Sequence, residues 1–202
     1  MKARELGALL LLGSIWGASY LFIKVAVQVF PPLTLVTLRV VMAALTSLLI
    51  LRLRGIALPR SRALWGTFLV MGLFNGAVPY SLITWGEQRI DSGLTAILIA
   101  TSPIFTAIFA HLFLHDERMT VTKIVGILLG FAGVAILIGP DAIAGAGQNL
   151  AGDVAVILAA ASYGATIVYA RKHLRGVAPM AASAGQMVMA SAAILPVALL
   201  VE

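Results

Sequence analysis

The stretch LGALLLLGSIWGASYLFIKV, residues 6–25, is 20 residues long and carries one charged side chain, that of Lys24. About 20 apolar residues cross the hydrocarbon core of a bilayer as a helix. Because the apolar residues surround this helix instead of forming one stripe, the stretch is typical of a membrane span. Six similar stretches follow, at 33–51, 64–83, 93–114, 121–138, 152–170 and 180–200. The sequence predicts an all-α fold, a polytopic transmembrane helix bundle.

The composition excludes several other classes of protein. The chain is 61% hydrophobic and only 11% charged, with a mean hydropathy of +1.04, outside the range of soluble domains. It has no cysteine, which excludes disulfides and thiolate metal sites. His111 and His115 have a spacing that could bind a metal, but they lie at the end of a span, where a solvated helix terminus is the ordinary interpretation. We therefore expect neither a metal nor a cofactor.

The basic residues indicate the orientation in the membrane. If the N-terminus is cytoplasmic and the spans alternate, eleven Lys and Arg residues lie inside and only Arg89 lies in an outer loop, with Lys24 and Arg39 within or beside spans. This asymmetry follows the positive-inside rule. The net charge of +6 is thus explained by topology, and we expect a lipid bilayer as partner and no nucleic acid. The eleven residues are Lys2, Arg4, Arg52, Arg54, Arg60, Arg62, Arg118, Lys123, Arg171, Lys172 and Arg175.

An internal repeat emerges when the chain is shifted by 147 positions. Trp16-Gly17-Ala18-Ser19 then lies over Tyr163-Gly164-Ala165-Thr166, and the match continues without a gap through Lys24 over Arg171 and Pro32 over Pro179. Alanine and valine pair cheaply in apolar sequence, so a chance match is the alternative. The glycine and proline matches at one offset favour a duplication.

The repeat has a topological consequence. Five spans precede the second copy, so its first span runs antiparallel to the first span of the chain. Inverted repeats are typical of secondary transporters, whose substrate site lies at the midplane between the halves. We expect a first five-helix repeat at 1–140, an extracytoplasmic linker at 141–150 and, at 151–202, two helices of an incomplete second repeat. Three helices of the second repeat are then missing.

The first and sixth spans carry polar and aromatic residues near their centres. We expect Trp16 and Ser19 in the first, and Tyr163 and Thr166 in the sixth, to line a central cavity and bind substrate. Packing at a helix interface, where Gly and Ser are common, is the alternative interpretation. Trp normally prefers the headgroup region, so a central Trp favours the cavity.

The third span combines an amide with a proline. Pro79 cannot donate a hydrogen bond to the carbonyl of Asn75, so one turn offers a free carbonyl and a side-chain amide. In lipid such groups need a partner from a neighbouring helix, water or a ligand. We interpret Asn75 and Tyr80 as substrate-binding residues and Pro79 as a hinge. A purely structural kink, or belt anchoring by Tyr80, remains equally open.

The fourth span contains Thr101-Ser102-Pro103 near its midpoint. Pro103 frees the carbonyl of Ile99, and the adjacent hydroxyls can satisfy it in part. We interpret Thr101 as substrate-binding and Pro103 as a hinge, against the alternative of a static kink.

Charged residues within the spans are few. Arg39 is expected to extend outward to the headgroups rather than to contact substrate. All the carboxylates, Glu87 among them, lie at span ends or in loops, so we expect no buried acid that could carry a coupled proton.

Several segments spread along the chain, given at the end of this paragraph, together resemble the EamA-type drug/metabolite transporter superfamily. The resemblance implies ten helices in two inverted five-helix repeats, a place in the bacterial inner membrane, and export of small metabolites such as amino acids. It implies no particular substrate or coupling ion. The segments that carry it are Trp16 to Lys24, Pro32 to Arg39, Tyr80-Ser81-Leu82-Ile83-Thr84-Trp85-Gly86-Glu87-Gln88, Ala96 to Phe105, Glu117, and Gly126 to Gly133.

The leading hypothesis is therefore a transporter that exports small metabolites or drug-like solutes by alternating access. A non-transporting or partial membrane subunit, which pairs with another chain, is the runner-up. A homo-oligomer is a separate possibility for the protein's assembly. An intramembrane enzyme is disfavoured, because His111 and His173 lie near cytoplasmic ends and no His-Glu-x-x-His motif occurs.

Overall fold

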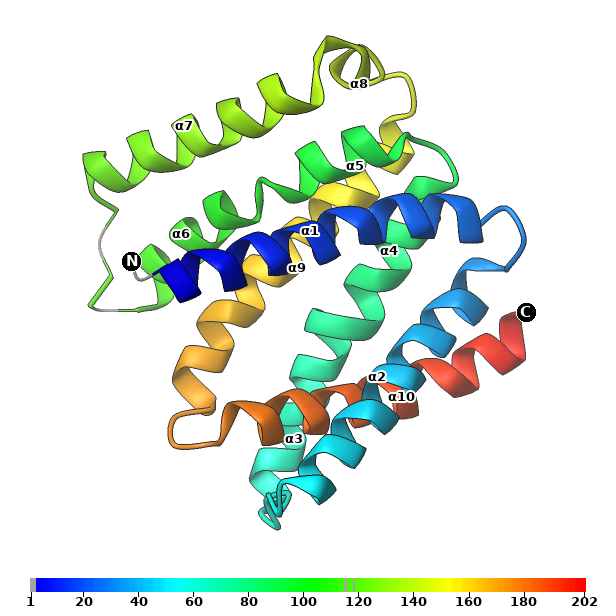
Figure 1. Cartoon of the computed structure of the whole chain (residues 1–202), viewed down its shortest axis with the longest axis vertical. Helices are drawn as coiled ribbons and strands as arrows, with labels where there is room; N and C mark the ends of the chain where they lie inside the picture. The colour runs from blue at the N-terminus through cyan, green and yellow to red at the C-terminus, as the bar shows by residue number, and fades with distance from the viewer. Residues whose placement is uncertain (1–2, 115, 118) are drawn as a thin grey trace.

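The computed structural model describes residues 3–114, 116–117 and 119–202, and every regular element among them is a helix (Figure 1). The all-α fold is thereby confirmed. The helices are α1 (Ala3–Ala26), α2 (Pro32–Leu53), α3 (Arg62–Gly72), the π-helix η1 (Leu73–Ala77), α4 (Val78–Glu87), α5 (Ser92–Ile99), α6 (Ser102–Phe113), α7 (Val121–Ile138), α8 (Pro140–Ala144), α9 (Leu150–His173) and α10 (Pro179–Val201).

Six segments of the described chain are long and apolar enough to cross a membrane. They are Glu5–Ala26, Pro32–Leu53, Arg62–Glu87, Ser92–Phe113, Leu150–His173 and Pro179–Val201. The third combines α3, η1 and α4, and the fourth combines α5 and α6. The fifth expected span corresponds to α7. Its apolar segment Val121–Ile136 is shorter than the six segments above. The expected polytopic bundle is confirmed by these helices.

The connections collect at two ends of the bundle (Figure 1). The α2–α3, α6–α7 and α9–α10 connections, which adjoin most of the Lys and Arg residues, lie at one end together with the start of α1. We call this the basic end. The α1–α2 and α4–α5 connections and α8 lie at the opposite end, which we call the far end. Lys2 and Arg118, which belong to the expected inner set, lie outside the described residues.

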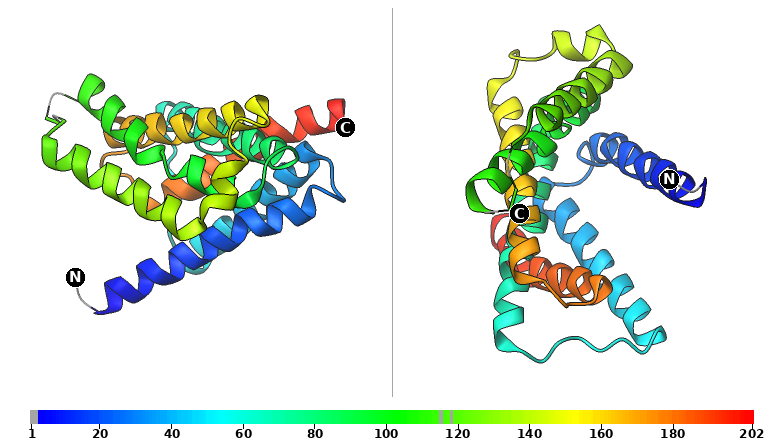
Figure 2. Two further views of the ribbon diagram at one scale, coloured as in Figure 1. Left: turned by 90° about the horizontal axis from the view of Figure 1, so that it is seen from above. Right: turned by 90° about the vertical axis from the view of Figure 1, so that its left-hand side faces the viewer.

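Helix α1 stands apart from the rest of the bundle (Figure 2). It packs along α4 and α5, and large apolar side chains such as Leu10, Phe22 and Trp16 are more than 60% exposed. The Lys24 ammonium ties its end to the bundle by donating hydrogen bonds to the carbonyls of Glu87 (2.7 Å) and Ile90 (2.8 Å).

The interior of the bundle forms where α2, η1, α4, α9 and α10 meet. One apolar cluster joins Val36 and Val40 of α2 to Ala77 of η1 and to Ala190 and Ile194 of α10. Helix α9 packs on α4 and α6. There, a Cβ on Gly164 would lie 2.7 Å from the backbone nitrogen of Thr106, whereas a Cβ on the corresponding Gly17 would meet nothing within 4 Å.

Gly72 allows α3 to touch the backbone of α10. A Cβ at this position would lie 2.6 Å from the backbone nitrogen of Ala190 and 2.6 Å from the carbonyl oxygen of Gln186. Neither backbone atom can move without moving α10. Close approach of this kind is the usual reason for glycine at membrane helix interfaces.

Gly72→Ala is therefore expected to lower the free energy of unfolding by about 1–3 kcal/mol, the usual cost of forcing an extra methyl group into a packed site. Unfolding in detergent, followed by circular dichroism, measures it. Gly66→Ala is the matched control, because a Cβ at Gly66 of the same helix would meet nothing within 4 Å. Equal stability of the two variants would contradict the close contact.

Candidate functional site

The third span changes its winding at the residues that carry its polar groups. Over Leu73–Ala77 the helix is a π-helix, in which the N–H of Val78 donates to the carbonyl of Leu73. Pro79, two residues after the π-helix ends, is fully buried in α4. A single π-turn is often found at a functional site. Here it widens the helix at Asn75, near the middle of the Arg62–Glu87 span.

The side chain of Asn75 links η1 to α9 and α10. Its Nδ2 donates to Gln186 Oε1 of α10 at 3.2 Å. Its Oδ1 lies 3.2 Å from Thr166 Oγ1 of α9, which can donate to it. Nearby, the Ser162 hydroxyl donates to the carbonyl of Phe74 at 2.5 Å. We call Asn75, Thr166 and Gln186 the amide bridge; it holds three helices together by polar groups at mid-span.

A second polar cluster surrounds Arg39 of α2. Its guanidinium lies over the ring of Tyr80, 4.9 Å from the ring centroid, and its Nη2 lies 3.4 Å from the Ser19 hydroxyl of α1. Tyr20 and Tyr163 pack against an apolar cluster of Ile23, Ile83 and Ala159. Both tyrosines lie within electrostatic reach of Arg39. We call Ser19, Tyr20, Arg39, Tyr80 and Tyr163 the arginine cluster.

The orientation of Arg39 corrects one expectation. Its side chain was expected to extend outward to the headgroups, but it turns inward onto α1 and α4. A guanidinium over an aromatic face gains electrostatic attraction without leaving the apolar interior. The inward position is therefore stabilised by Tyr80 and Ser19.

The two clusters correspond under the shift of 147 positions. Ser19 and Arg39 of the arginine cluster match Thr166 and Gln186 of the amide bridge. In one cluster Arg39 of α2 contacts both Ser19 of α1 and the Tyr80 ring of α4. In the other, Thr166 of α9 and Gln186 of α10 both contact Asn75 of η1. Arg39 and Gln186 were not among the expected substrate-binding residues, although their alignment was a signal that could have identified both.

Among the expected site residues, the structure brings together Ser19, Tyr80 and Tyr163 in one cluster and Asn75 with Thr166 in the other. Trp16 is separate, because its side chain is 65% exposed on α1. Thr101 lies at the break between α5 and α6, and its hydroxyl donates to the carbonyl of Leu98 at 2.6 Å. At the same break the Ser102 hydroxyl donates to the carbonyl of Ile99 at 2.6 Å, so the group freed by Pro103 is satisfied as expected.

The burial of Glu87 corrects another expectation. Glu87 is the last residue of α4, but its side chain is 0% exposed, and neither carboxylate oxygen has a hydrogen-bond partner among the described residues. The described chain thus does contain a buried acid. Glu87 does lie at the end of its span, but there Lys24 of α1 bonds to its backbone carbonyl and α9 packs on the neighbouring Gly86.

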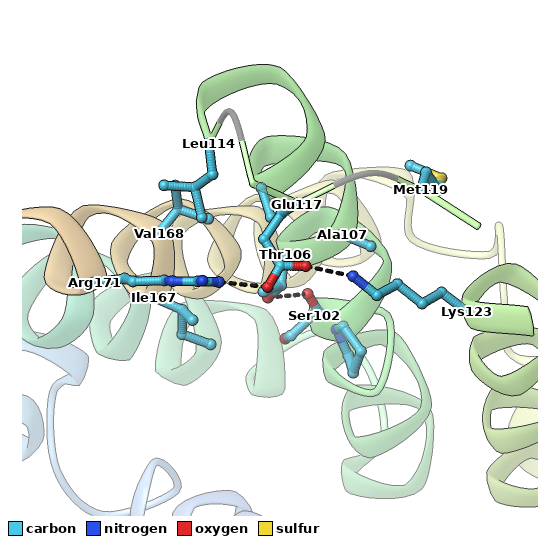
Figure 3. A pocket seen from close by; sticks show the side chains of 12 residues that line it. Ser102, Thr106, Ala107, Leu114, Glu117, Met119, Lys123, Ile167, Val168 and Arg171 are labelled. Carbon is cyan, nitrogen blue, oxygen red and sulfur yellow. Dashed lines mark hydrogen bonds and ion pairs between the residues drawn. The ribbon is translucent and has the colours of Figure 1, made fainter.

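A cavity of about 420 Å³ lies between α6 and α9 toward the basic end (Figure 3). Ser102, Pro103 and Thr106 are among its lining residues, and Glu117, which also lines it, lies between Arg171 and Lys123 (Figure 3). Arg171 Nη1 donates to Glu117 Oε1 at 2.5 Å, and Lys123 pairs with the other oxygen of Glu117. Arg171 also pairs with Asp116 at 2.8 Å. This network connects the α6–α7 loop, α7 and α9.

The network makes stability depend on pH. Hydrogen bonds from Lys123 and then Arg171 lower the pKa of Glu117 from its ordinary value of 4.5 to about 2. A lowered folded-state pKa stabilises the protein above the unfolded value and loses this effect as pH falls. We expect the melting temperature in detergent to fall between about pH 4.5 and pH 2, and Glu117→Gln to remove that part of the pH dependence. Asp141→Asn on α8 is the control. An unchanged profile in Glu117→Gln would contradict the network.

No three His, Asp or Glu side chains come together as a metal site among the described residues. His115, half of the histidine pair weighed as a metal site, lies outside those residues, so its spacing with His111 is not tested.

Several known proteins similar to this chain are named as transporters. The profile of the EamA-like transporter family matches residues 4–139. The chain is 37% identical over 158 residues to the uncharacterized inner membrane transporter YedA of Escherichia coli (strain K12). This match covers 76% of this chain and 48% of that protein. The chain is 31% identical over 163 residues to the uncharacterized transporter YoaV of Bacillus subtilis (strain 168), covering 79% and 56%. The chain thus spans about half the length of these relatives.

A solved structure titled "Crystal structure of protein" has the same fold. The TM-score is 0.67 at 20% sequence identity, and the match covers 92% of this chain and 66% of that chain. At this identity the likeness concerns the fold alone.

Proposed function

The chain belongs to the EamA-like transporter family, and from this premise we propose that it moves small solutes across a membrane by alternating access, with the arginine cluster and the amide bridge as its solute site. The observation that carries the proposal is the amide bridge. Two amides and a hydroxyl from three different helices meet at mid-span beside a π-turn and a proline. Polar groups are costly at this depth and in transporters mark substrate pathways.

The chemistry of the two clusters suggests the class of solute. Arg39 offers a cation, the tyrosines offer aromatic faces, and Asn75 with Gln186 offers amide donors and acceptors. A carboxylate pairs well with a guanidinium, while an amino group or a drug-like ring fits the amides and the tyrosines. We propose amino acids and similar small metabolites as solutes, with export as the direction. Pro79 and Pro103 serve as hinges, and Trp16 and Thr101 contribute to the cavity in other states of the cycle.

The helix bounds support the repeat proposed for the chain. Helix α1 begins at residue 3 and α9 at residue 150, while α2 begins at 32 and α10 at 179, each pair 147 positions apart. In both figures α1 runs opposite to α9, and α2 runs opposite to α10 (Figures 1 and 2). We propose that residues 1–140 form one five-helix repeat, that 141–150 is an extracytoplasmic linker, and that 151–202 begins an inverted second repeat. The N-terminus is then cytoplasmic and the membrane is the inner one.

A second candidate is a partial membrane subunit that transports only with another polypeptide or a second copy. The exposed apolar side chains of α1 favour it, as does a cavity of about 530 Å³ along the Gly126 and Gly130 face of α7.

Solute counterflow in liposomes tests the proposal. The purified chain is reconstituted, the liposomes are loaded with unlabelled amino acids or aromatic cations, and uptake of the labelled solute is followed against protein-free liposomes. We expect accelerated uptake of at least one carboxylate-bearing solute. If the folded chain exchanged no solute alone but did so after co-purification with a second polypeptide, the partial-subunit candidate would be favoured. Absence of exchange in both preparations would overturn the transport proposal.

A further inference from the structure

Glu87 lies outside the two clusters, in surroundings where burial disfavours a charged carboxylate. Its side chain is completely buried, and both oxygens are without a hydrogen-bond partner among the described residues. A buried charge without a partner is so costly that the group neutralises instead.

Two cations, Lys24 and Arg39, lie within electrostatic reach of Glu87, but neither donates a hydrogen bond to its carboxylate among the described residues. The Lys24 ammonium of α1 donates to the backbone carbonyls of Glu87 and Ile90. The guanidinium of Arg39 on α2 faces Tyr80 and Ser19. On α4 and its connection, the guanidinium of Arg89 lies over the Trp85 ring, 3.5 Å from its centroid.

The remaining titratable groups do not supply a partner either. Tyr20 of α1 is within electrostatic reach but makes no hydrogen bond to Glu87 among the described residues. On α9, Asp153 is also buried, yet its Oδ2 accepts a hydrogen bond from the N–H of Gly147 at 2.7 Å. Glu87 thus differs from the other buried acid in having neither oxygen bonded.

The same place is where α4 and α9 close together at the far end. A Cβ on Gly86 would lie 2.7 Å from Val156 Cγ2, and one on Gly152 would lie 2.9 Å from Ile90 Cγ2. Ile90, Leu94 and Val156 form a buried apolar cluster there. Closure therefore excludes water from the carboxyl group, while separation of α4 from α9 would readmit it.

We propose that Glu87 is a proton-binding site of a gate at the far end: the carboxylate takes up one proton from the adjoining solution as α4 and α9 close, and returns it when they separate. The inference rests on the proposed transport function, since a gate requires a pathway to close. The step is Glu87–COO⁻ plus H⁺ giving Glu87–COOH, with no other bond changed. Low pH favours the closed gate because the proton binds to that state.

Thiol accessibility tests the gate without any solute. The chain has no cysteine, so Val156→Cys, at a position with 0% exposure, reports opening to a membrane-impermeant thiol reagent. Leu150→Cys, at a position 69% exposed on the same helix, corrects for the effect of pH on thiol reactivity. The corrected rate is expected to rise several-fold between about pH 6 and pH 9, and by at most about ten-fold per pH unit for one titrating carboxyl group.

Glu87→Gln identifies the group responsible. The amide imitates the protonated acid, so the corrected rate should stay low at every pH, whereas Asp91→Asn, at an exposed carboxylate nearby, should leave the pH dependence intact. A flat profile in the unsubstituted background, or a persisting rise in Glu87→Gln, would overturn the proposal.

If Glu87→Gln fails to fold, infrared spectroscopy of the unsubstituted protein should show a neutral carboxyl band that disappears as pH rises. Absence of this band would also overturn the proposal. Because neither readout needs a solute, failure of counterflow would not obscure them.

Discussion

Asn75→Ala is expected to reduce solute counterflow by roughly 5- to 150-fold, which corresponds to about 1–3 kcal/mol for a buried polar group left unpaired. The substitution removes the group that connects η1 to α9 and α10. Gln186 then loses its amide partner at mid-span, and the solute loses the amide that faces it. Initial rates of counterflow, measured across solute concentrations, give the size of the change.

The control for Asn75 is a polar side chain outside the clusters. Gln148→Ala removes an exposed amide that bonds only locally, to the carbonyl of Ala144 at 2.9 Å, so counterflow should be unchanged. Thr166→Val removes the hydroxyl from the opposite side of the amide bridge and should weaken transport in the same direction. Counterflow at the unsubstituted rate in a folded Asn75→Ala protein would remove the amide bridge from the solute site.

Arg39→Met is expected to impair carboxylate-bearing solutes selectively. Methionine keeps much of the apolar volume but removes the charge. Hydrogen bonds to charged groups contribute about 1.5–3 kcal/mol, so counterflow of such solutes should fall by roughly 10- to 150-fold. Solutes without a carboxylate should be affected much less. Arg39→Lys should be intermediate, because it retains the charge but loses the planar group that stacks on Tyr80.

A matched arginine separates this effect from a general loss of cation–π contacts. Arg89 also lies over an aromatic ring, that of Trp85, but on the surface, so Arg89→Met should leave counterflow unchanged. An equal loss for charged and uncharged solutes in Arg39→Met would indicate a structural role for Arg39 and contradict solute binding.

The spans and several of their internal features could be predicted from the sequence. A stretch of about 20 apolar residues has few stable structures other than a helix across a bilayer. Proline removes a backbone hydrogen bond of the helix wherever it lies. The break at Pro103 and its satisfaction by Ser102 follow from such local rules. The match of Ser19 with Thr166, read from an offset of 147 positions, likewise pointed to two residues that lie in polar contacts.

Other features depend on packing that local rules do not describe. Trp16 and Tyr163 align in the sequence, yet one is exposed and the other lies in the arginine cluster. A helix that is apolar all round has no stripe to show which face turns inward. Glu87 is buried where Lys24 of α1 bonds to its carbonyl and α9 packs on Gly86, and both helices are distant along the chain.

The central claim is that two related helix pairs lie in opposite orientations across the membrane and bring their polar residues together at mid-span. Single cysteines introduced as Arg54→Cys and Gln148→Cys in this cysteine-free chain test it in intact cells with a membrane-impermeant thiol reagent. The account predicts that Cys at position 148 reacts in intact cells, whereas Cys at position 54 reacts only after permeabilisation. Reaction of both from the same side would contradict it.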